Sequence, residues 1–444
     1  MLPAMTPDHV MPDEGVVAVI GLGKIGLPLA AQFAGKGMTV IGCDVLPAVV
    51  ETVNAGHSHI GEEPGLEEKV AVAVNTGRLL ATLDTTAAVK AAGTVVLIVP
   101  LLVDVRHDID FRQLDSAVQA IGRGLRAGML VICETTLPVG TTRTRIGPAL
   151  EAVSGLRAGE DFYLAFSPER LYAGRIFEDL ARYPKIVGGV NESSTQRAVA
   201  FYRDVLDAEV QAVENAETAE FTKLAETTYR DVNIALANEL AVYGAQRHVN
   251  VREAFKAANT QPYSHLHRPS IGVGGHCIPV YPHFLLADAT EGELVLPRIS
   301  RATNDAMAAR ALDSLASALG GLDGRRVLVL GTSYREDVKE MAFSTAIPLV
   351  EGLHRRGAVA LVHDPLFEPR ELAALEAEVA DLEGEAPLQV DAVIVQAYHN
   401  QYRGLDWSRF RGLKVVFDGR GSLDPETIRK TGAAYLAIET PQNP

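Results

Sequence analysis

The sequence predicts an α/β fold in which two doubly wound domains are joined by one long central helix. Three observations support this prediction. An apolar run, Val16–Ile20, leads directly into a glycine-rich turn and a helical segment. A helical pattern spans residues 215–248, and a second series of short apolar runs begins at Arg326. Strands that alternate with helices in this way are typical of parallel sheets covered by helices.

We therefore divide the chain into four parts. Residues 1–14 form an N-terminal tail, and residues 15–210 form the first α/β domain. Residues 211–318 form a central helical domain, and residues 319–444 form the second α/β domain.

The overall composition restricts the classes of function. A formal net charge of −15 over 444 residues opposes non-specific binding to nucleic acid, because such binding requires a basic surface. The three cysteines, Cys43, Cys133 and Cys277, are too few and too scattered for a disulfide framework or a zinc cluster. The N-terminus lacks a signal-peptide pattern, and no run reaches the roughly 18 apolar residues that span a bilayer. We expect a cytoplasmic protein without bound metal and without a membrane or nucleic-acid partner.

The first domain opens with a dinucleotide-binding pattern. A helix is expected from Leu27 to about Lys36, and a strand at Thr39–Cys43 ends in Asp44. This is the Rossmann fingerprint: the glycines let a pyrophosphate approach the helix N-terminus, and the acid binds ribose hydroxyls. An Asp at this position repels the 2′-phosphate of NADP, so NAD is the predicted cofactor. The predicted cofactor-binding residues of this segment are Gly21, Gly23, Lys24, Ile25, Gly26 and Asp44.

The alternation of strands and helices continues along the first domain. Strands are expected at Thr94–Val99, Met129–Cys133, Phe162–Phe166 and Lys185–Gly189, the last of which should end the sheet, and a closing helix at Ser193–Leu206. Ligands of doubly wound folds bind beyond the carboxyl ends of the strands. Pro100 and the residues from Glu134 to Thr136 fall at such ends. A third strand end carries Glu169 and Arg170, which could also form a simple surface ion pair.

The central helix carries two patterned faces. One face is mostly apolar, with residues that recur every three or four positions: Phe221, Leu224, Ala225, Thr228, Val232, Ala235, Leu236, Glu239 and Leu240. Lys223, Thr227, Arg230 and Asn233 have spacings that place them on a second face. That face is either solvated or directed toward a substrate. Because helices of this length often form subunit interfaces, we expect a homodimer or a higher homo-oligomer.

A glycine-rich loop at Gly272–Pro282 contains a single thiol, Cys277. Glycines let a backbone pass close to a ligand, and the prolines stiffen the exit from the loop. Cys277 is therefore a candidate nucleophile. The alternative is a tight loop in which the cysteine is a small buried hydrophobic residue.

The second α/β domain repeats the strand pattern without a second fingerprint. Strands are expected at Arg326–Leu330, Val359–His363, Ala392–Val395 and Lys414–Phe417. Arg335 and Lys339 follow the first of these strands, and they are candidates for binding a nucleotide diphosphate.

Taken in order, these motifs resemble the UDP-glucose/GDP-mannose dehydrogenase family over about Val16 to Leu436. The branch they look most like acts on UDP-N-acetylhexosamines, with UDP-N-acetyl-D-mannosamine as the foremost expected substrate. The motifs that carry the resemblance are Gly21–Gly26, Glu134–Thr141, Phe166–Arg170, Lys223–Leu224, Tyr229–Ala235 and Gly274–Pro279.

The resemblance implies an NAD-dependent four-electron oxidation of the sugar C6 hydroxyl to a carboxylate, for the synthesis of cell-surface polysaccharide precursors. It implies that Cys277 forms a thiohemiacetal and then a thioester. Lys223 would stabilise oxyanion charge, Glu169 would act near water or proton transfer, and Thr227 would lie beside them. Pro100 and Thr136 would complete the NAD site. The implied substrate-binding residues are Arg170, Arg230, Asn233, Arg268, Gly274, Gly275, His276, Tyr334, Arg335 and Lys339.

Four features depart from the pattern common in that family. Thr227 replaces an Asn, Tyr281 replaces an Asp and Ala342 replaces an Arg. The loop before Cys277 reads Ser270-Ile271-Gly272 where the family commonly has Gly-Pro-Gly. The alternative functions are a UDP-glucose 6-dehydrogenase, a two-electron hydroxyacid dehydrogenase and a non-catalytic binder of nucleotide sugars.

Overall fold

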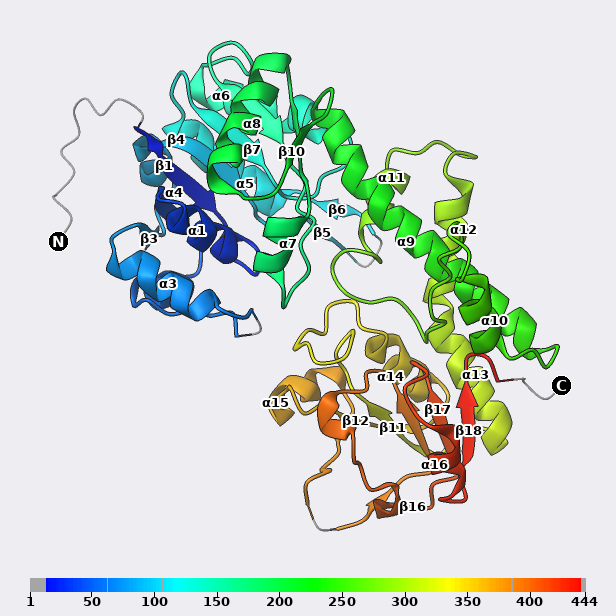
Figure 1. The fold of residues 1–444 in the computed structure, drawn as a ribbon. Coiled ribbons are helices and arrows are strands. Elements are labelled where there is room, and N and C mark those ends of the chain that lie inside the picture. The colour runs from blue at the N-terminus through cyan, green and yellow to red at the C-terminus, as the bar shows by residue number, and fades with distance from the viewer. Residues whose placement is uncertain (1–12, 62, 105–106, 385, 441–444) are drawn as a thin grey trace. The chain divides into compact units, whose positions relative to one another are not determined.

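The computed structural model describes residues 13–61, 63–104, 107–384 and 386–440. Most of the predicted N-terminal tail lies outside these ranges. The chain separates into two compact units, residues 1–226 and 227–444. The long helix α9 (Ala216–Ala245) begins in the first unit and ends in the second (Figure 1).

The first unit is built on an eight-stranded sheet with the order β10-β9-β8-β7-β4-β1-β2-β3. The strands are β1 (Asp13–Ile20), β2 (Thr39–Cys43), β3 (Leu79–Thr82), β4 (Ala92–Leu97), β7 (Leu130–Cys133), β8 (Tyr163–Phe166), β9 (Lys185–Gly189) and β10 (Val210–Ala212). All neighbours pair in parallel except β8 and β9, which are antiparallel. A short hairpin pairs β5 (Leu102–Val103) with β6 (Ile109–Asp110). The predicted doubly wound architecture is confirmed.

One expectation for this sheet was wrong. Lys185–Gly189 does not end the sheet, because β10 adds a parallel strand beside it. Only Val210 of this short strand is buried, so the strand carries no apolar run that a sequence pattern could reveal.

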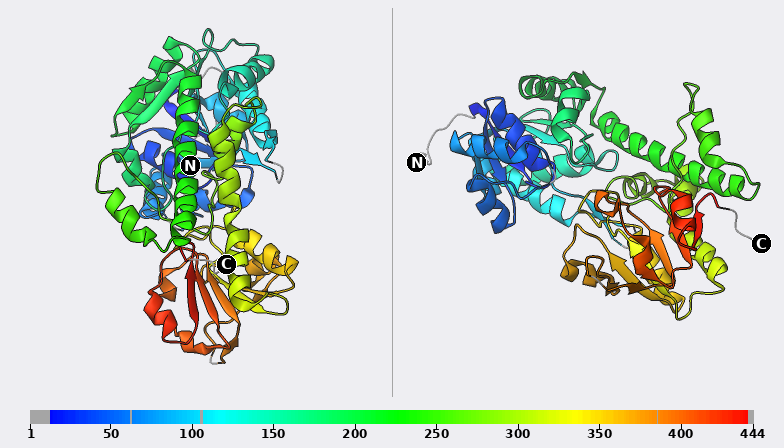
Figure 2. Two further views of the ribbon diagram at one scale, coloured as in Figure 1. Left: turned by 90° about the vertical axis from the view of Figure 1, so that its right-hand side faces the viewer. Right: turned by 60° about the horizontal axis from the view of Figure 1, so that its bottom comes forward.

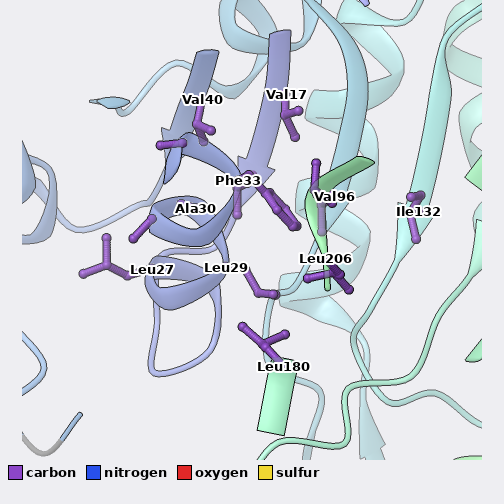
Figure 3. Close-up of a cluster of buried hydrophobic side chains, with 14 of the residues drawn as sticks. Val17, Leu27, Leu29, Ala30, Phe33, Val40, Val96, Ile132, Leu180 and Leu206 are labelled. Carbon is purple, nitrogen blue, oxygen red and sulfur yellow. The ribbon is translucent and has the colours of Figure 1, made fainter. Parts of the chain in front are cut away.

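Helices cover the sheet in layers. They are α1 (Gly26–Gly35), α2 (Pro47–Asn54), α3 (Leu66–Asn75), α4 (Thr85–Ala91), α5 (Arg112–Gly124), a short π-helix (Thr142–Ile146), α6 (Gly147–Ser154), α7 (Ile176–Arg182) and α8 (Glu192–Val205). Phe33 of α1 meets Phe201 of α8 edge to face, with ring centroids 5.5 Å apart. The core beneath α1 joins Leu29 and Phe33 to Val17 and Val96 of the sheet (Figure 3). Burial of these apolar side chains fixes the register on which the site depends.

Register aligns the carboxyl ends of four strands. Ile20 pairs with Leu97, Leu97 with Cys133, and Cys133 with Phe166. The residues that follow these four positions therefore emerge at one edge of the sheet. Cys43 and Cys133 are buried within their strands.

The second unit combines helices with a six-stranded parallel sheet. Its helices are α10 (Val251–Ala258), α11 (Tyr281–Leu286), α12 (Val295–Asp305), α13 (Met307–Leu319), α14 (Ala346–Arg355), α15 (Pro369–Leu372) and α16 (Pro425–Arg429), with 3₁₀ turns at Ala373–Leu375, Asn400–Tyr402 and Trp407–Arg409. The sheet has the order β13-β12-β11-β15-β17-β18, with β11 (Arg326–Leu330), β12 (Val359–His363), β13 (Glu378–Val379), β15 (Ala392–Val395), β17 (Val415–Asp418) and β18 (Ala434–Ala437). A separate pair joins β14 (Leu388–Gln389) to β16 (Phe410–Arg411). Figure 2 shows the strands of the six-stranded sheet side by side, coloured from yellow to red.

The buried face of α9 differs from the predicted apolar face. Leu224 and Ala235 are buried, but Phe221, Leu236 and Leu240 are exposed. In the second unit the buried positions of α9 include Asp231 and Asn238, which bond to α12. The guanidinium of Arg301 lies 2.5 Å from Asp231, and the Asn238 side chain donates to Asn304 at 3.1 Å. Polar pairing between the helices replaces the expected apolar contact.

Candidate active site

The glycine turn of the first unit has a different constraint at each glycine. Gly21 has a φ of +99°, and a Cβ there would lie 2.7 Å from the Ile98 carbonyl oxygen. A Cβ at Gly26 would overlap the carbonyl oxygen of Gly21. A Cβ at Gly23 would meet no protein atom within 4 Å, so that position is open toward a ligand. This division of roles fits a pyrophosphate lying against the turn at the start of α1.

Asp44 lies beside the turn, at the end of β2. Its carboxylate accepts the main-chain N–H groups of Leu22 and Leu46, both at 3.0 Å. The acid is therefore fixed at the carboxyl edge of the sheet, next to the glycines. The predicted NAD-binding turn and its acid are brought together, with Lys24 and Ile25 within the turn.

The ends of β4 and β7 are joined by a hydrogen bond. The Thr135 hydroxyl donates to the Val99 carbonyl oxygen at 2.7 Å, and Thr136 is buried beside it. Pro100 follows as an exposed residue. The loop that leaves Thr136 is held by Glu220 of α9, which accepts the N–H groups of Gly140 at 2.5 Å and Thr142 at 2.8 Å. Burial raises the pKa of Glu220 to about 7.

Charged side chains cluster at the ends of β7 and β8. Lys185 Nζ lies 2.8 Å from Glu134 Oε2 and 3.3 Å from Glu169 Oε2. Glu134 also accepts the Tyr202 hydroxyl, and the ammonium of Lys223 donates to the main-chain carbonyl of Glu169. Two predicted catalytic residues, Glu169 and Lys223, are thus in contact.

Arg170 pairs with a residue other than Glu169, the partner expected for a surface ion pair. Its guanidinium forms two hydrogen bonds with Glu226, at 2.9 and 3.1 Å, and a third with the Pro184 carbonyl at 3.2 Å. Only its main-chain N–H contacts the Glu169 carboxylate, at 2.7 Å. The expectation of a Glu169–Arg170 ion pair was wrong, because Lys185 takes the charge of Glu169.

Sequence reasoning treated Lys185 only as the first residue of a strand. One signal was present: the strand Lys185–Gly189 is otherwise apolar or glycine, and a lysine that begins so buried a strand requires an anionic partner. The antiparallel pairing of β9 with β8 brings Lys185 to the residues that follow β8.

In the second unit, the loop that carries Cys277 packs on the loop that follows β11. A Cβ at Gly274 would lie 2.7 Å from the Tyr334 Cβ. Gly275 has a φ of +89°, and a Cβ there would lie 2.9 Å from the Tyr334 ring. The Gly275 N–H donates to the Ala342 carbonyl at 2.9 Å. These glycines permit close approach between two protein loops.

The residues around the thiol are held from several directions. His276 Nε2 lies 3.4 Å from Glu340 Oε2, and the Tyr281 N–H donates to the Cys277 carbonyl at 2.9 Å. Cys277 itself is exposed. The alternative in which this cysteine is a buried hydrophobic residue is therefore wrong.

The loop that follows β11 is fixed by a buried carboxylate. Asp364 accepts the N–H groups of Thr332 at 2.8 Å and Ser333 at 2.9 Å, and it lies 2.9 Å from His399 Nε2. Burial opposes ionisation of Asp364, but His399 and the loop N–H groups outweigh it and lower the pKa to about 2. The Arg335 side chain donates to the Tyr334 hydroxyl at 3.0 Å, whereas Lys339 pairs with Glu371 at 2.8 Å.

A basic cavity of about 340 Å³ lies in the second unit. Its charged lining comprises Arg252, Lys256, Arg268, Arg420 and Glu439. A cavity of this size and charge suits an anionic small molecule. Arg268 was predicted, while Arg420 was missed because it comes from a distant segment. Arg252 and Lys256, which lie on α10 shortly before Arg268, were also missed.

The basic cavity is connected to the loop that follows β11. Arg420 donates to the Tyr334 carbonyl at 2.9 Å and to the Gln396 carbonyl at 2.6 Å. The remaining predicted binders lie on α9: Arg230 is exposed, and the Asn233 side chain donates to the Tyr229 carbonyl at 2.7 Å. Thr227 is buried. Within the described ranges, no three His, Cys, Asp or Glu side chains converge as metal ligands would.

Comparison with known proteins matches nearly the whole chain. Three models of the UDP-glucose/GDP-mannose dehydrogenase family align with it: the NAD binding domain with residues 16–206, the central domain with residues 217–306, and the UDP binding domain with residues 328–425. The chain belongs to the UDP-glucose/GDP-mannose dehydrogenase family. This family assignment confirms that NAD is the cofactor and that the protein is a nucleotide-sugar oxidoreductase.

Individual members of the family are similar over most of their length. A UDP-N-acetyl-D-mannosamine dehydrogenase from Pyrococcus horikoshii is 37% identical over 413 residues, which cover 91% of this chain and 95% of that protein. A solved structure of the UDP-D-ManNAc dehydrogenase from Pyrococcus horikoshii superposes with a TM-score of 0.87 and 33% identity, covering 96% of this chain and 100% of that chain. A UDP-glucose dehydrogenase from Pyrobaculum islandicum superposes with a TM-score of 0.84 and 29% identity, covering 98% and 100%.

The structure also bears on the predicted partners. None of the described helices is long and apolar enough to cross a membrane. The family's UDP binding domain covers the part of the chain that contains Tyr334, Arg335, Lys339 and Arg420.

Proposed function

We propose that this enzyme oxidises the C6 hydroxyl of a UDP-N-acetylhexosamine, foremost UDP-N-acetyl-D-mannosamine, to the uronate. The observation that carries the proposal is the exposed thiol of Cys277 on a glycine loop packed against the UDP binding domain. Support for the substrate comes from the similar enzyme of Pyrococcus horikoshii, which is named for that sugar nucleotide. The uronate would serve as a precursor for cell-surface polysaccharide.

A four-electron oxidation requires a covalent stage. The first oxidation gives an aldehyde. An aldehyde cannot transfer a hydride as an alcohol does until a nucleophile adds to its carbonyl carbon. The Cys277 thiol adds there to give a thiohemiacetal, and the second oxidation gives a thioester. Water then breaks the C–S bond, releasing the carboxylic acid and the thiol. NAD held at the glycine turn would supply the hydride acceptor for both oxidations, so two NADH would form for each sugar.

Residues of the first unit are assigned to the charge that develops at C6. The ammonium of Lys223 stabilises the oxyanion, and its contact with the Glu169 carbonyl fixes the position of its side chain. The Glu169 carboxylate accepts the proton of the water that attacks the thioester. Thr136 and Pro100 border the nicotinamide end of the cofactor, and Thr227 contributes one hydroxyl to the substrate side.

The basic cavity supports the assignment of the UDP group. We assign the diphosphate to Arg268, whose guanidinium offers a planar fork that matches phosphate oxygens. Arg420 adds positive charge to the cavity, while its Nε and one Nη already donate to main-chain carbonyls. Tyr334 and Arg335 extend that surface along the loop after β11. Arg170 and Lys339 are weaker candidates than predicted, because each is already paired with a glutamate.

We also propose a homodimer in the cytoplasm. An exposed apolar stripe on α9, formed by Tyr229, Leu236 and Leu240, supports the dimer, because these residues lie on one side of the helix. All three cysteines are free thiols, as in a reducing compartment. The division into domains at residues 15–210, 211–318 and 319–444 is part of the same proposal.

The decisive experiment measures NADH formed per mole of sugar nucleotide over a panel of UDP- and GDP-sugars. The proposal requires two NADH per sugar and the highest kcat/KM with a UDP-N-acetylhexosamine. Faster oxidation of UDP-glucose would favour the second candidate, which the Pyrobaculum islandicum structure supports. One NADH per sugar would indicate a two-electron dehydrogenase, and tight binding without NADH formation would indicate a binding protein.

A further inference from the structure

A buried carboxylate and a partly buried one share one ammonium group at the carboxyl edge of the first sheet. The side chain of Lys185 is 6% exposed, that of Glu134 is 0% exposed and that of Glu169 is 12% exposed. An isolated charge at this depth is strongly unfavourable, so each group depends on the others to be ionised. The ammonium also lies 4.9 Å from the centroid of the Tyr202 ring, so the ring covers a further side of Lys185.

The two carboxylates are not equivalent. Burial raises the pKa of Glu134 to about 7, even though Lys185 opposes the shift. Burial also opposes ionisation of Glu169, but Lys185, a hydrogen bond from Glu134 and Lys223 outweigh it, and the pKa of Glu169 is lowered. Where two neighbouring acids are separated in this way, one retains the proton and the other stays anionic.

We propose that Lys185 is a positioning residue that keeps the Glu169 carboxylate ionised and fixed, with Glu134 as the proton-holding partner behind it. This inference rests on the proposed function, in which Glu169 accepts a proton from water. In that step the water oxygen bonds to the thioester carbon, one water proton moves to Glu169, and the C–S bond breaks to release Cys277 as a thiolate.

Other charged or titratable groups near Glu169 contact it differently. Lys223 donates to its main-chain carbonyl, and Arg170 offers only a main-chain N–H to the carboxylate while its guanidinium pairs with Glu226. Tyr202 reaches Glu134 rather than Glu169. The Lys185 ammonium lies 3.3 Å from the Glu169 carboxylate, and the charge of Lys223 also favours the anion.

The first test is the pH dependence of kcat/KM for Lys185→Met, Lys185→Arg and Glu134→Gln. Loss of the ammonium removes a charge that favours the anion, so the acid limb of Lys185→Met moves to higher pH by about one to three units. Lys185→Arg restores most of the shift. Glu134→Gln leaves the acid limb in place, because the amide replaces a carboxyl that is already protonated there.

A lysine elsewhere on the first unit provides the matched control. Lys36 pairs with Asp207 at 2.6 Å on the surface, and Lys36→Met is expected to leave the acid limb unchanged. The proposal is overturned if Lys185→Met lowers the whole profile without shifting the acid limb, since that is the effect of a structural role alone.

The second test does not depend on turnover. Proteins labelled with ¹³C at the glutamate carboxyl carbon are titrated by NMR, and the Glu169 resonance is assigned from its loss in Glu169→Gln. We expect a higher Glu169 pKa in Lys185→Met and also in the double variant Lys185→Met/Glu134→Gln, which removes both ionisable partners of Glu169 and is used if the single variant does not fold. An unchanged Glu169 pKa in the variant that folds refutes the proposal.

The two tests separate this proposal from the proposed function. A wild-type protein that oxidises no nucleotide sugar would refute the function, while the NMR titration would still decide whether Lys185 controls Glu169.

Discussion

At the scale of single residues, the proposed chemistry depends on a thiol that is exposed and on acids that are buried. Cys277 is accessible to a reactant, whereas Cys43 and Cys133 are enclosed within strands. Burial raises the pKa of the Cys43 thiol to about 12, so this thiol is not a nucleophile at neutral pH. Among the three cysteines, Cys277 alone fits the proposed covalent stage.

Cys277→Ala is predicted to abolish formation of the uronate, because no thioester can form. Uronate and NADH are measured together, and the uronate yield should fall at least about a hundredfold. Cys43→Ala is the matched control, and it should retain two NADH per sugar. Full four-electron turnover by Cys277→Ala would show that another group is the nucleophile.

Asp44→Asn is predicted to weaken NAD binding about tenfold, because a charged acceptor for the ribose hydroxyls is lost while one oxygen remains for the Leu22 N–H. Preference for NAD over NADP should fall as well, since repulsion of the 2′-phosphate disappears. Calorimetric titration with NAD, NADP and the sugar nucleotide checks both effects. Equal weakening toward cofactor and sugar would contradict the assignment of Asp44.

Residues of the candidate site were predicted where the residues that form a motif lie close together in the sequence. The turn from Gly21 to Gly26 and the acid at Asp44 lie in one short segment, where spacing alone is informative. Lys185 and Arg420 were missed because their partners are distant in sequence. Lys185 is 51 residues from Glu134, and Arg420 is 86 residues from Tyr334.

At the scale of elements, most strands that carry a continuous apolar run were predicted within about two residues, whereas β1 begins three residues before the predicted run. β2 and β9 were predicted with the bounds found in the structure. The buried face of α9 was predicted less well. Periodicity grouped apolar residues that lie on different sides of the helix, and it gave no sign that Asp231 and Asn238 would be buried against α12.

The link between β12 and the loop after β11 yields a pH-dependent prediction. Asp364 has a pKa lowered to about 2, so it stabilises the fold above its unfolded pKa of about 4, and this contribution is lost as the pH falls toward 2. Asp364→Asn should therefore lower the free energy of unfolding by about 2 kcal/mol at pH 7, and this difference should shrink as the pH falls from about 4 toward 2.

Denaturant unfolding at several pH values measures this difference. Asp313 of α13 is an exposed carboxylate paired with Arg356 at 2.6 Å, and Asp313→Asn should change stability by less than about 1 kcal/mol. A pH-independent loss of stability in Asp364→Asn would mean that its charge is not the stabilising feature.

At the scale of the whole molecule, α9 belongs to both units and presents apolar side chains to solvent. Leu236 is 43% exposed and Leu240 is 39% exposed. Contiguous exposed apolar residues on a helix commonly mark a protein–protein interface. This feature gives the proposed homodimer a surface that mutation can test.

The double variant Leu236→Asp/Leu240→Asp is predicted to be monomeric at micromolar concentration, since burial of two charges at an apolar interface is unfavourable. Analytical ultracentrifugation measures the mass. Val379→Asp, at a comparably exposed valine of β13, is the control and should leave the mass of the assembly unchanged. An unchanged assembly in the double variant would place the interface elsewhere.

The close packing of Gly274 and Gly275 on Tyr334 has a consequence for engineering sugar specificity. The two loops are 59 or more residues apart in sequence. A side chain at Gly274 or Gly275 would collide with Tyr334, so each loop fits only a partner of matching shape. Consider a chimera in which the second α/β domain, joined near residue 319, comes from a relative. In that chimera the cysteine loop would pack against a loop from a different protein. Chimeras between family members should therefore take the segments around Gly275 and Tyr334 from the same parent protein.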